Sequence, residues 1–131
     1  MALVFTNSGE NLVLEMIVNK TAAQNLVLKL YSSNTTPSET DTAGTYTEAT
    51  FSGYAAITLT GASWGTASGS IAYAQQTFTH NGGGTSNSIY GYFVVQATSG
   101  TLLYAERDGS APFTLTNLGD NVKLTPTITA D

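Results

Sequence analysis

One stretch decides the fold: Ser88-Ile89-Tyr90-Gly91-Tyr92-Phe93-Val94-Val95-Gln96-Ala97. It is apolar at consecutive positions, which is typical of a central strand buried on both faces of its sheet. A tight turn is predicted at Ser99-Gly100, and a second apolar run follows, Thr101-Leu102-Leu103-Tyr104-Ala105-Glu106. Together the two runs predict an antiparallel hairpin at the centre of the domain.

Shorter strands are predicted on both sides of this hairpin, with apolar residues at alternate positions. They recur about every 8–12 residues with turn residues between them, which is typical of a sandwich or a barrel. We therefore expect an all-β fold, a two-sheet antiparallel sandwich of the jelly-roll kind. The predicted strands cover residues 25–31, 54–60, 70–74, 76–79, 113–116, 122–125 and 127–129, and residues 46–51 form a short turn or an edge strand.

The first eight residues allow two interpretations. Leu3, Val4 and Phe5 are consecutive apolar residues, and the polar breakers of 6–9 follow them. They form either the first strand of the domain or an extended arm that docks on a neighbouring subunit. With the arm, the chain divides into an N-terminal arm over residues 1–8 and a single β-sandwich domain over residues 9–131.

Residues 9–19 predict one short N-terminal helix that ends near Asn19. Asn7 or Ser8 is the predicted N-cap, because a short polar side chain there accepts a hydrogen bond from the first free backbone N–H groups. A buried strand over residues 12–14 is the alternative. Two pairs of apolar residues spaced four apart suit one buried helical face: Leu12 with Met16, and Val13 with Ile17.

The composition limits the kinds of partner. The 131 residues suit a single domain. Only 10% are charged, against about 25% in an average soluble domain. Surfaces with so little charge are common on proteins that pack against copies of themselves or against a partner. The net charge of −5 and the four scattered basic residues leave no basic patch, so we expect no nucleic-acid partner.

Cysteine is absent, which excludes disulfides, thiolate metal sites and a cysteine nucleophile. No apolar stretch approaches the roughly 20 residues that span a bilayer, so we expect no membrane partner. The opening residues lack a basic start and a long apolar run, and we expect no secretory leader.

Catalysis is not expected. The single histidine, His80, precedes Asn81 and the glycines 82–84, which predicts a flexible, solvated loop rather than the rigid setting of a catalytic imidazole. The glycines lack the lysine and spacing of a phosphate-binding loop. The acidic pairs, Glu39 with Asp41 and Glu106 with Asp108, are interpreted as solvated loop charges, with a bound cation as the alternative. We expect no enzyme activity, no cofactor and no metal.

Tyrosines and one tryptophan suggest a competing function. Aromatic side chains on a β-sandwich can form a carbohydrate-binding surface, although most of these lie in predicted strands, where packing is the usual role. Trp64 stands among small residues outside a strong strand and is the aromatic residue best placed to bind a glycan.

Several motifs run through most of the chain. They include Asn25-Leu26-Val27-Leu28-Lys29-Leu30-Tyr31, Asn34-Thr35-Thr36-Pro37, Tyr46-Thr47-Glu48-Ala49-Thr50-Phe51-Ser52-Gly53-Tyr54 and Leu102-Leu103-Tyr104-Ala105-Glu106-Arg107. With these motifs the chain resembles small structural virion proteins of tailed bacteriophages. The motifs are structural, and no catalytic residue is carried over from the resemblance.

The resemblance implies a capsid decoration, or cement, protein that clamps neighbouring capsomers. It implies a homotrimer bound to the major capsid protein on the capsid surface of the virion, made in the host cytoplasm. A receptor- or carbohydrate-binding module of a tail or fibre is the alternative. The expected contact residues lie in the arm and in two polar loops, 35–45 and 80–87: Leu3, Val4, Phe5, Pro37, Glu39, Asp41, His80 and Asn81.

Overall fold

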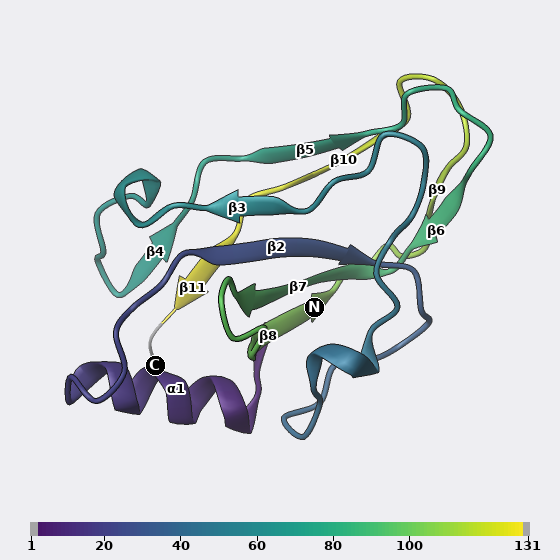
Figure 1. Cartoon of the computed structure of the whole chain (residues 1–131). Coiled ribbons are helices and arrows are strands. Elements are labelled where there is room, and N and C mark those ends of the chain that lie inside the picture. The colour runs from purple at the N-terminus through teal and green to yellow at the C-terminus, as the bar shows by residue number, and fades with distance from the viewer. Residues whose placement is uncertain (1–2, 130–131) are drawn as a thin grey trace.

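The computed structural model describes residues 3–129 (Figure 1). These residues are mostly β, with antiparallel sheets and one α-helix, α1 (Asn7–Ile17), and this coarse architecture confirms the prediction. Two short 3-10 turns, η1 (Ala43–Thr45) and η2 (Gly61–Ser63), lie between strands. The strands are β1 (Val4–Phe5), β2 (Leu26–Tyr31), β3 (Ile57–Leu59), β4 (Ser70–Ala72), β5 (Gln76–Thr79), β6 (Asn87–Ile89), β7 (Gly91–Gln96), β8 (Leu102–Arg107), β9 (Phe113–Leu115), β10 (Asn121–Leu124) and β11 (Thr127–Thr129).

A five-stranded sheet in the order β1-β8-β7-β2-β3 forms the centre of the molecule. The predicted hairpin is confirmed as β7 and β8, and all six residues of β7 are buried. The predicted strand over residues 88–97 is, however, two strands that part at Tyr90. The Tyr90 N–H donates to the carbonyl of Tyr31, and β6 leaves the sheet to pair with β9.

Three two-stranded ribbons, β5/β10, β4/β11 and β6/β9, accompany this sheet. Figure 1 shows β5 and β10 running side by side at the top and α1 lying below the sheet. The sheets are small and do not close. Phe78 of β5 and Leu115 of β9 pack into the same apolar cluster as Leu28 and Leu30 of β2, so the ribbons cover one face of the sheet.

A second, smaller cluster covers the opposite face of the sheet. Tyr31, Phe93 and Val95 point to this side, and Tyr46 stacks on Phe93 with ring centroids 5.2 Å apart. Ala43, in η1, packs against the same cluster. The segment that contains the predicted loop 35–45 therefore packs over this second face of the sheet.

The residues before α1 belong to the sheet and not to a free arm. Val4 pairs with Ala105 and Phe5 pairs with Tyr104, which is the first-strand interpretation for these residues. Asn7 and Ser8 lie within α1, so the chain is helical before the expected arm boundary at residue 8. Residues 1 and 2 of the expected arm lie outside the described residues.

The N-cap of α1 is Thr6, so the prediction of Asn7 or Ser8 was wrong. Thr6 Oγ1 accepts a hydrogen bond from the Gly9 N–H at 3.1 Å and donates one to the Leu102 carbonyl at 2.8 Å. The same hydroxyl thus caps the helix and joins it to β8, a tertiary contact that local spacing does not reveal. Gly9 lies so close to the backbone of Leu103 that no Cβ atom would fit there. The helix ends at Ile17, near the predicted Asn19.

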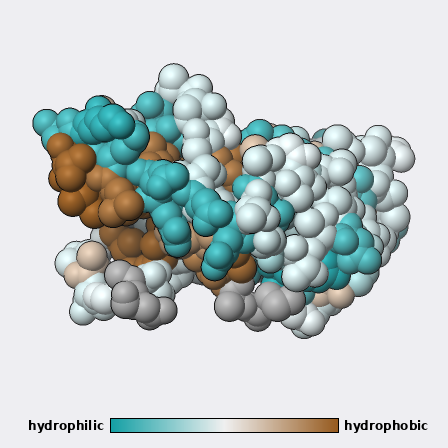
Figure 2. Space-filling view, turned by 90° about the horizontal axis from the view of Figure 1, so that it is seen from below, coloured by the Kyte–Doolittle hydropathy of each residue, from teal (hydrophilic) through white to brown (hydrophobic). Residues whose placement is uncertain are grey.

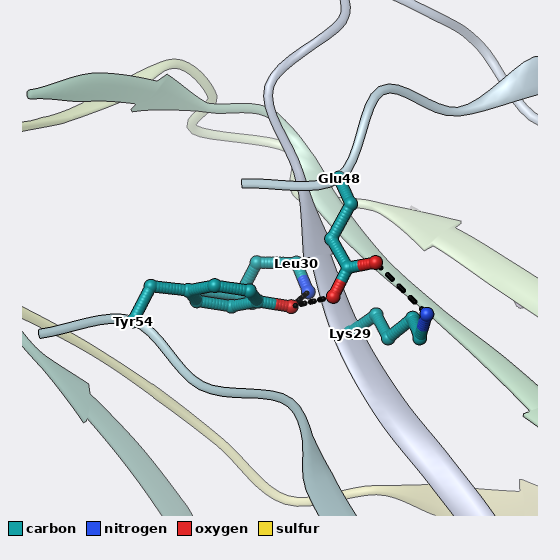
Figure 3. A network of polar contacts seen from close by, with 4 residues as sticks. All are labelled: Lys29, Leu30, Glu48 and Tyr54. Carbon is teal, nitrogen blue, oxygen red and sulfur yellow. Dashed lines mark hydrogen bonds and ion pairs between the residues drawn. The ribbon is translucent and has the colours of Figure 1, made fainter. Parts of the chain in front are cut away.

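Beyond the end of β3, residues 47–49 and nearby side chains complete the edge of β2 (Figure 3). Glu48 forms an isolated antiparallel bridge with Tyr31, and the Ala49 N–H donates to the Leu30 carbonyl at 3.0 Å. β3 pairs only with Leu26–Leu28, and the Leu30 N–H donates to the hydroxyl of Tyr54 at 3.2 Å. That hydroxyl donates to Oε1 of Glu48 at 3.0 Å, while Lys29 Nζ lies 2.8 Å from Oε2 of the same carboxylate. Burial and then the Glu48 charge raise the pKa of Tyr54. Residues 46–54 therefore hold this end of β2 in place through Glu48 and Tyr54.

Candidate interaction surface

Loop 80–87 is fixed in place, and the prediction of a solvated His80 was wrong. The His80 side chain is fully buried and stacks on Phe51 with ring centroids 6.0 Å apart. Its Nδ1 accepts a hydrogen bond from the Gly82 N–H at 3.0 Å, so Nε2 carries the proton and donates to the Thr85 carbonyl at 2.9 Å. His80 therefore closes its own loop and has no free ring nitrogen for catalysis.

The neighbouring residues extend this arrangement. The Asn81 N–H donates to the Ser52 carbonyl, and the Gly119 N–H donates to the His80 carbonyl. The carboxylate of Asp120 accepts two backbone hydrogen bonds, from Thr116 and Asn117, which lower its pKa. These contacts tie the loop to two other turns. Glycines 82–84 thus serve a tight, ordered turn.

Loop 35–45 is also tied to the body of the protein. The Asn7 N–H of α1 donates to the carbonyl of Glu39 at 2.8 Å. Asp41 accepts hydrogen bonds from the Tyr46 hydroxyl at 2.7 Å and from the Ser38 N–H at 2.9 Å. Pro37 is half-buried. The structure therefore brings this loop beside the start of α1, next to the strand formed by Val4 and Phe5, while His80 and Asn81 pack against segments 51–53 and 117–120.

A different surface stands out, and it centres on α1. The helix and the central sheet enclose an apolar groove of about 690 Å³. Figure 2 shows hydrophobic side chains gathered on this side of the molecule, with a hollow between them. Glu10 is the only ionisable side chain among the described residues of its lining. The apolar lining includes Phe5, Leu12, Val13, Leu14, Met16, Leu26, Leu59, Trp64, Leu103 and Ile128.

Beside the groove, α1 and its C-cap expose large apolar side chains to solvent. Leu14 is 62% exposed, Ile17 is 74% exposed and Val18 is 70% exposed. Their exposure contradicts the prediction that Ile17 lies on a buried face, because Leu12 is the one large apolar side chain that α1 buries fully. We call these three residues together with the groove the α1 face. Contiguous exposed apolar patches on soluble proteins mark association sites.

Gln96, the last residue of the central strand β7, also lines this groove. Only 3% of the residue is exposed. Its Oε1 accepts a hydrogen bond from the Ser99 hydroxyl, whereas its Nε2 has no hydrogen-bond partner within residues 3–129. A buried donor without an acceptor costs about 1–3 kcal/mol. Within the described residues, the Gln96 amide is therefore a destabilising polar group beside the groove.

Trp64, the aromatic residue expected to bind a glycan, packs partly into the body of the protein. It is half-buried, lines the groove, and its ring meets that of Tyr73 edge-on with centroids 5.2 Å apart. Its apolar surface thus belongs to the α1 face.

A second, smaller hollow of about 240 Å³ lies near the end of the hairpin. Glu106, Asp108 and Lys123 lie along it, with Phe113 as an aromatic wall. The Tyr92 hydroxyl donates to Glu106 Oε2 at 2.6 Å, and burial followed by this hydrogen bond raises the pKa of Tyr92. This hollow combines an aromatic ring with polar groups, which is a combination that suits a small polar ligand.

No group of three or more histidine, aspartate or glutamate side chains within the described residues is placed to hold a metal ion. Among residues 3–129, no helix is both long enough and apolar enough to cross a membrane. No known family model matches the chain. A search of curated proteins also finds no similar sequence.

Proposed function

We propose that this chain is a structural virion protein of a tailed phage, a capsid decoration protein that works by association rather than by catalysis. The single observation that carries the proposal is the α1 face, where Leu14, Ile17 and Val18 project beside an apolar groove. A stable protein contact buries about 800 Å² on each partner, and an apolar centre with little charge is typical of such contacts.

The proposed partners are other copies of the chain, in the homotrimer that the resemblance implies, and the major capsid protein. Nucleic acid and membranes are not proposed partners. On this proposal the ribbons β5/β10 and β4/β11 act as the second layer of a sandwich, and the protein lies on the outer surface of the shell. Many modest contacts, repeated around a closed shell, would reinforce one another through multivalency.

Binding to particles tests this function. Particles that lack the chain would be mixed with purified wild-type protein, sedimented, and assayed for bound protein. Ile17→Glu places a charge on the α1 face and is expected to reduce binding at least tenfold. Leu118→Glu is the matched control, because Leu118 is also an exposed leucine, at 77%, but lies in the turn near Gly82. Absence of wild-type binding to any particle would refute the proposal.

A second function is favoured by the hollow that Glu106 and Phe113 line: carbohydrate binding by a tail or fibre module. Glycan-array binding by the wild-type chain that is lost in Glu106→Gln would support it. Trp64→Ala tests the competing location, the groove. Glycan binding that survives both substitutions would refute both locations, and no binding to any glycan would exclude this function.

A further inference from the structure

We infer that the α1 face pairs with the same face of a second copy, so that two α1 helices lie antiparallel across a two-fold axis. This two-fold pair takes the place of the homotrimer that the resemblance implies. The inference rests on the proposed function, because it names the partner of the same surface. The first argument is shape. One patch carries both the protruding side chains, Leu14, Ile17 and Val18, and the apolar hollow beside them. A two-fold contact needs such a self-complementary patch.

The second argument is charge. Glu10 lies in the first turn of α1 and Lys20 lies just beyond its last turn. Antiparallel pairing would place Glu10 of one copy near Lys20 of the other, at both ends of the contact. In this pairing the positive N-terminal end of each helix would also lie beside the negative C-terminal end of the other, which is favourable. Lys20 is free to take part, because its contact with Glu15 is a surface ion pair in which the lysine side chain is 70% exposed.

The third argument is the unsatisfied amide of Gln96. Its Nε2 donor has no acceptor within residues 3–129, although Gln96 lines the groove. An occupant that brings an oxygen atom is therefore favoured over a purely apolar one.

Charge reversal tests this arrangement in solution. Light scattering on a sizing column would measure the mass of the wild type and of three variants, Glu10→Lys, Lys20→Glu and the double variant. The wild type is expected to be dimeric. Each single variant places like charges together and is expected to weaken dimerisation at least tenfold, while the double variant restores it. Leu118→Glu is the control and stays dimeric.

Cysteine cross-linking tests the two-fold axis directly, since the natural chain has no cysteine. Leu14 lies near the middle of the span from Glu10 to Lys20, so Leu14→Cys would face itself across the axis. A disulfide requires Cα atoms about 4.4–6.8 Å apart. With air and copper-phenanthroline as the oxidant, Leu14→Cys is expected to form a covalent dimer, whereas Leu118→Cys, at an even more exposed leucine, is expected to form none.

The outcomes separate this inference from the proposed function. A monomeric wild type, or a dimer that both single charge variants leave unchanged, overturns the pairing. If the wild type is monomeric but Ile17→Glu still abolishes particle binding, the α1 face binds the capsid protein instead, and only the pairing is refuted. A trimer that Leu14→Cys cannot cross-link also overturns the two-fold arrangement. Loss of particle binding by the wild type refutes the function, whatever its mass.

Discussion

The hydroxyl of Tyr54 donates a hydrogen bond to Glu48 at 3.0 Å while it accepts one from the N–H of Leu30 at 3.2 Å. Tyr54 thereby supplies the acceptor for one N–H of β2 beyond the end of its pairing with β3, where residues 47–49 provide the other backbone contacts. A backbone N–H of a central strand would otherwise lose its protein partner, and one side chain prevents this.

Tyr54→Phe removes this acceptor and is expected to lower the free energy of unfolding by about 1–2 kcal/mol, measured by urea denaturation. Tyr90→Phe is the control, because Tyr90 is also half-buried and its hydroxyl has no hydrogen-bond partner in the described structure. Equal stability of the Tyr54→Phe variant and the wild type would contradict the role of this hydroxyl.

Removal of a different tyrosine hydroxyl is expected to stabilise the protein. Tyr104 is fully buried, and its hydroxyl has no partner among residues 3–129. Tyr104→Phe keeps the ring that packs on Phe5 and removes an unsatisfied polar atom, so the free energy of unfolding should rise by about 1 kcal/mol. Tyr92→Phe is the comparison: it loses the bond to Glu106 and should be less stable. A fall in the stability of Tyr104→Phe would show that the hydroxyl has a partner.

His80 is expected to be a stability residue. His80→Ala leaves a cavity beside Phe51 and deprives the Gly82 N–H of its acceptor. The free energy of unfolding should fall by about 2–4 kcal/mol. Amide exchange at Gly82, followed by NMR, should accelerate in the variant. If stability and exchange were unchanged, the solvated loop expected from the sequence would be correct after all.

Alkaline pH is expected to unfold the protein through five tyrosines whose pKa values are raised by burial or partial burial. Burial raises the pKa of Tyr31 to about 12, and burial also raises the pKa values of Tyr46, Tyr54, Tyr92 and Tyr104. In the unfolded chain these groups ionise near pH 10. The folded state therefore holds protons that the unfolded state loses, and stability falls as the pH rises from about 10 to 12.

Circular dichroism and phenolate absorbance, recorded together across this range, check the alkaline prediction. Loss of structure should accompany the ionisation of these five tyrosines. Complete ionisation near pH 10 with the fold intact would contradict it.

The central hairpin could be predicted from sequence because both faces of β7 are buried, which makes its residues apolar without interruption. The division of that stretch at Tyr90 could not, since it depends on hydrogen bonds to the distant Tyr31. His80 was misplaced for a similar reason. Its polar and glycine-rich neighbours are typical of a solvated loop, while the stacking of its ring on Phe51 is a long-range contact.

The α1 face was missed although its signal is in the sequence. Leu12, Val13, Leu14, Met16, Ile17 and Val18 surround the helix and its end, so one buried stripe cannot hold them all. Two apolar pairs spaced four apart were assigned to the core, but Leu12 is the one large apolar residue of the four that is buried against the sheet. A helix with more apolar residues than one buried face can hold is the pattern that would have predicted an exposed association face.

Electron cryomicroscopy of the intact virion tests the central claim most directly, that this chain associates through its α1 face as a part of the shell. The account predicts density for the chain on the capsid surface at capsomer junctions, with Leu14, Ile17 and Val18 covered by protein. Density in which these three side chains face solvent, density confined to the tail, or no density on the particle would contradict it.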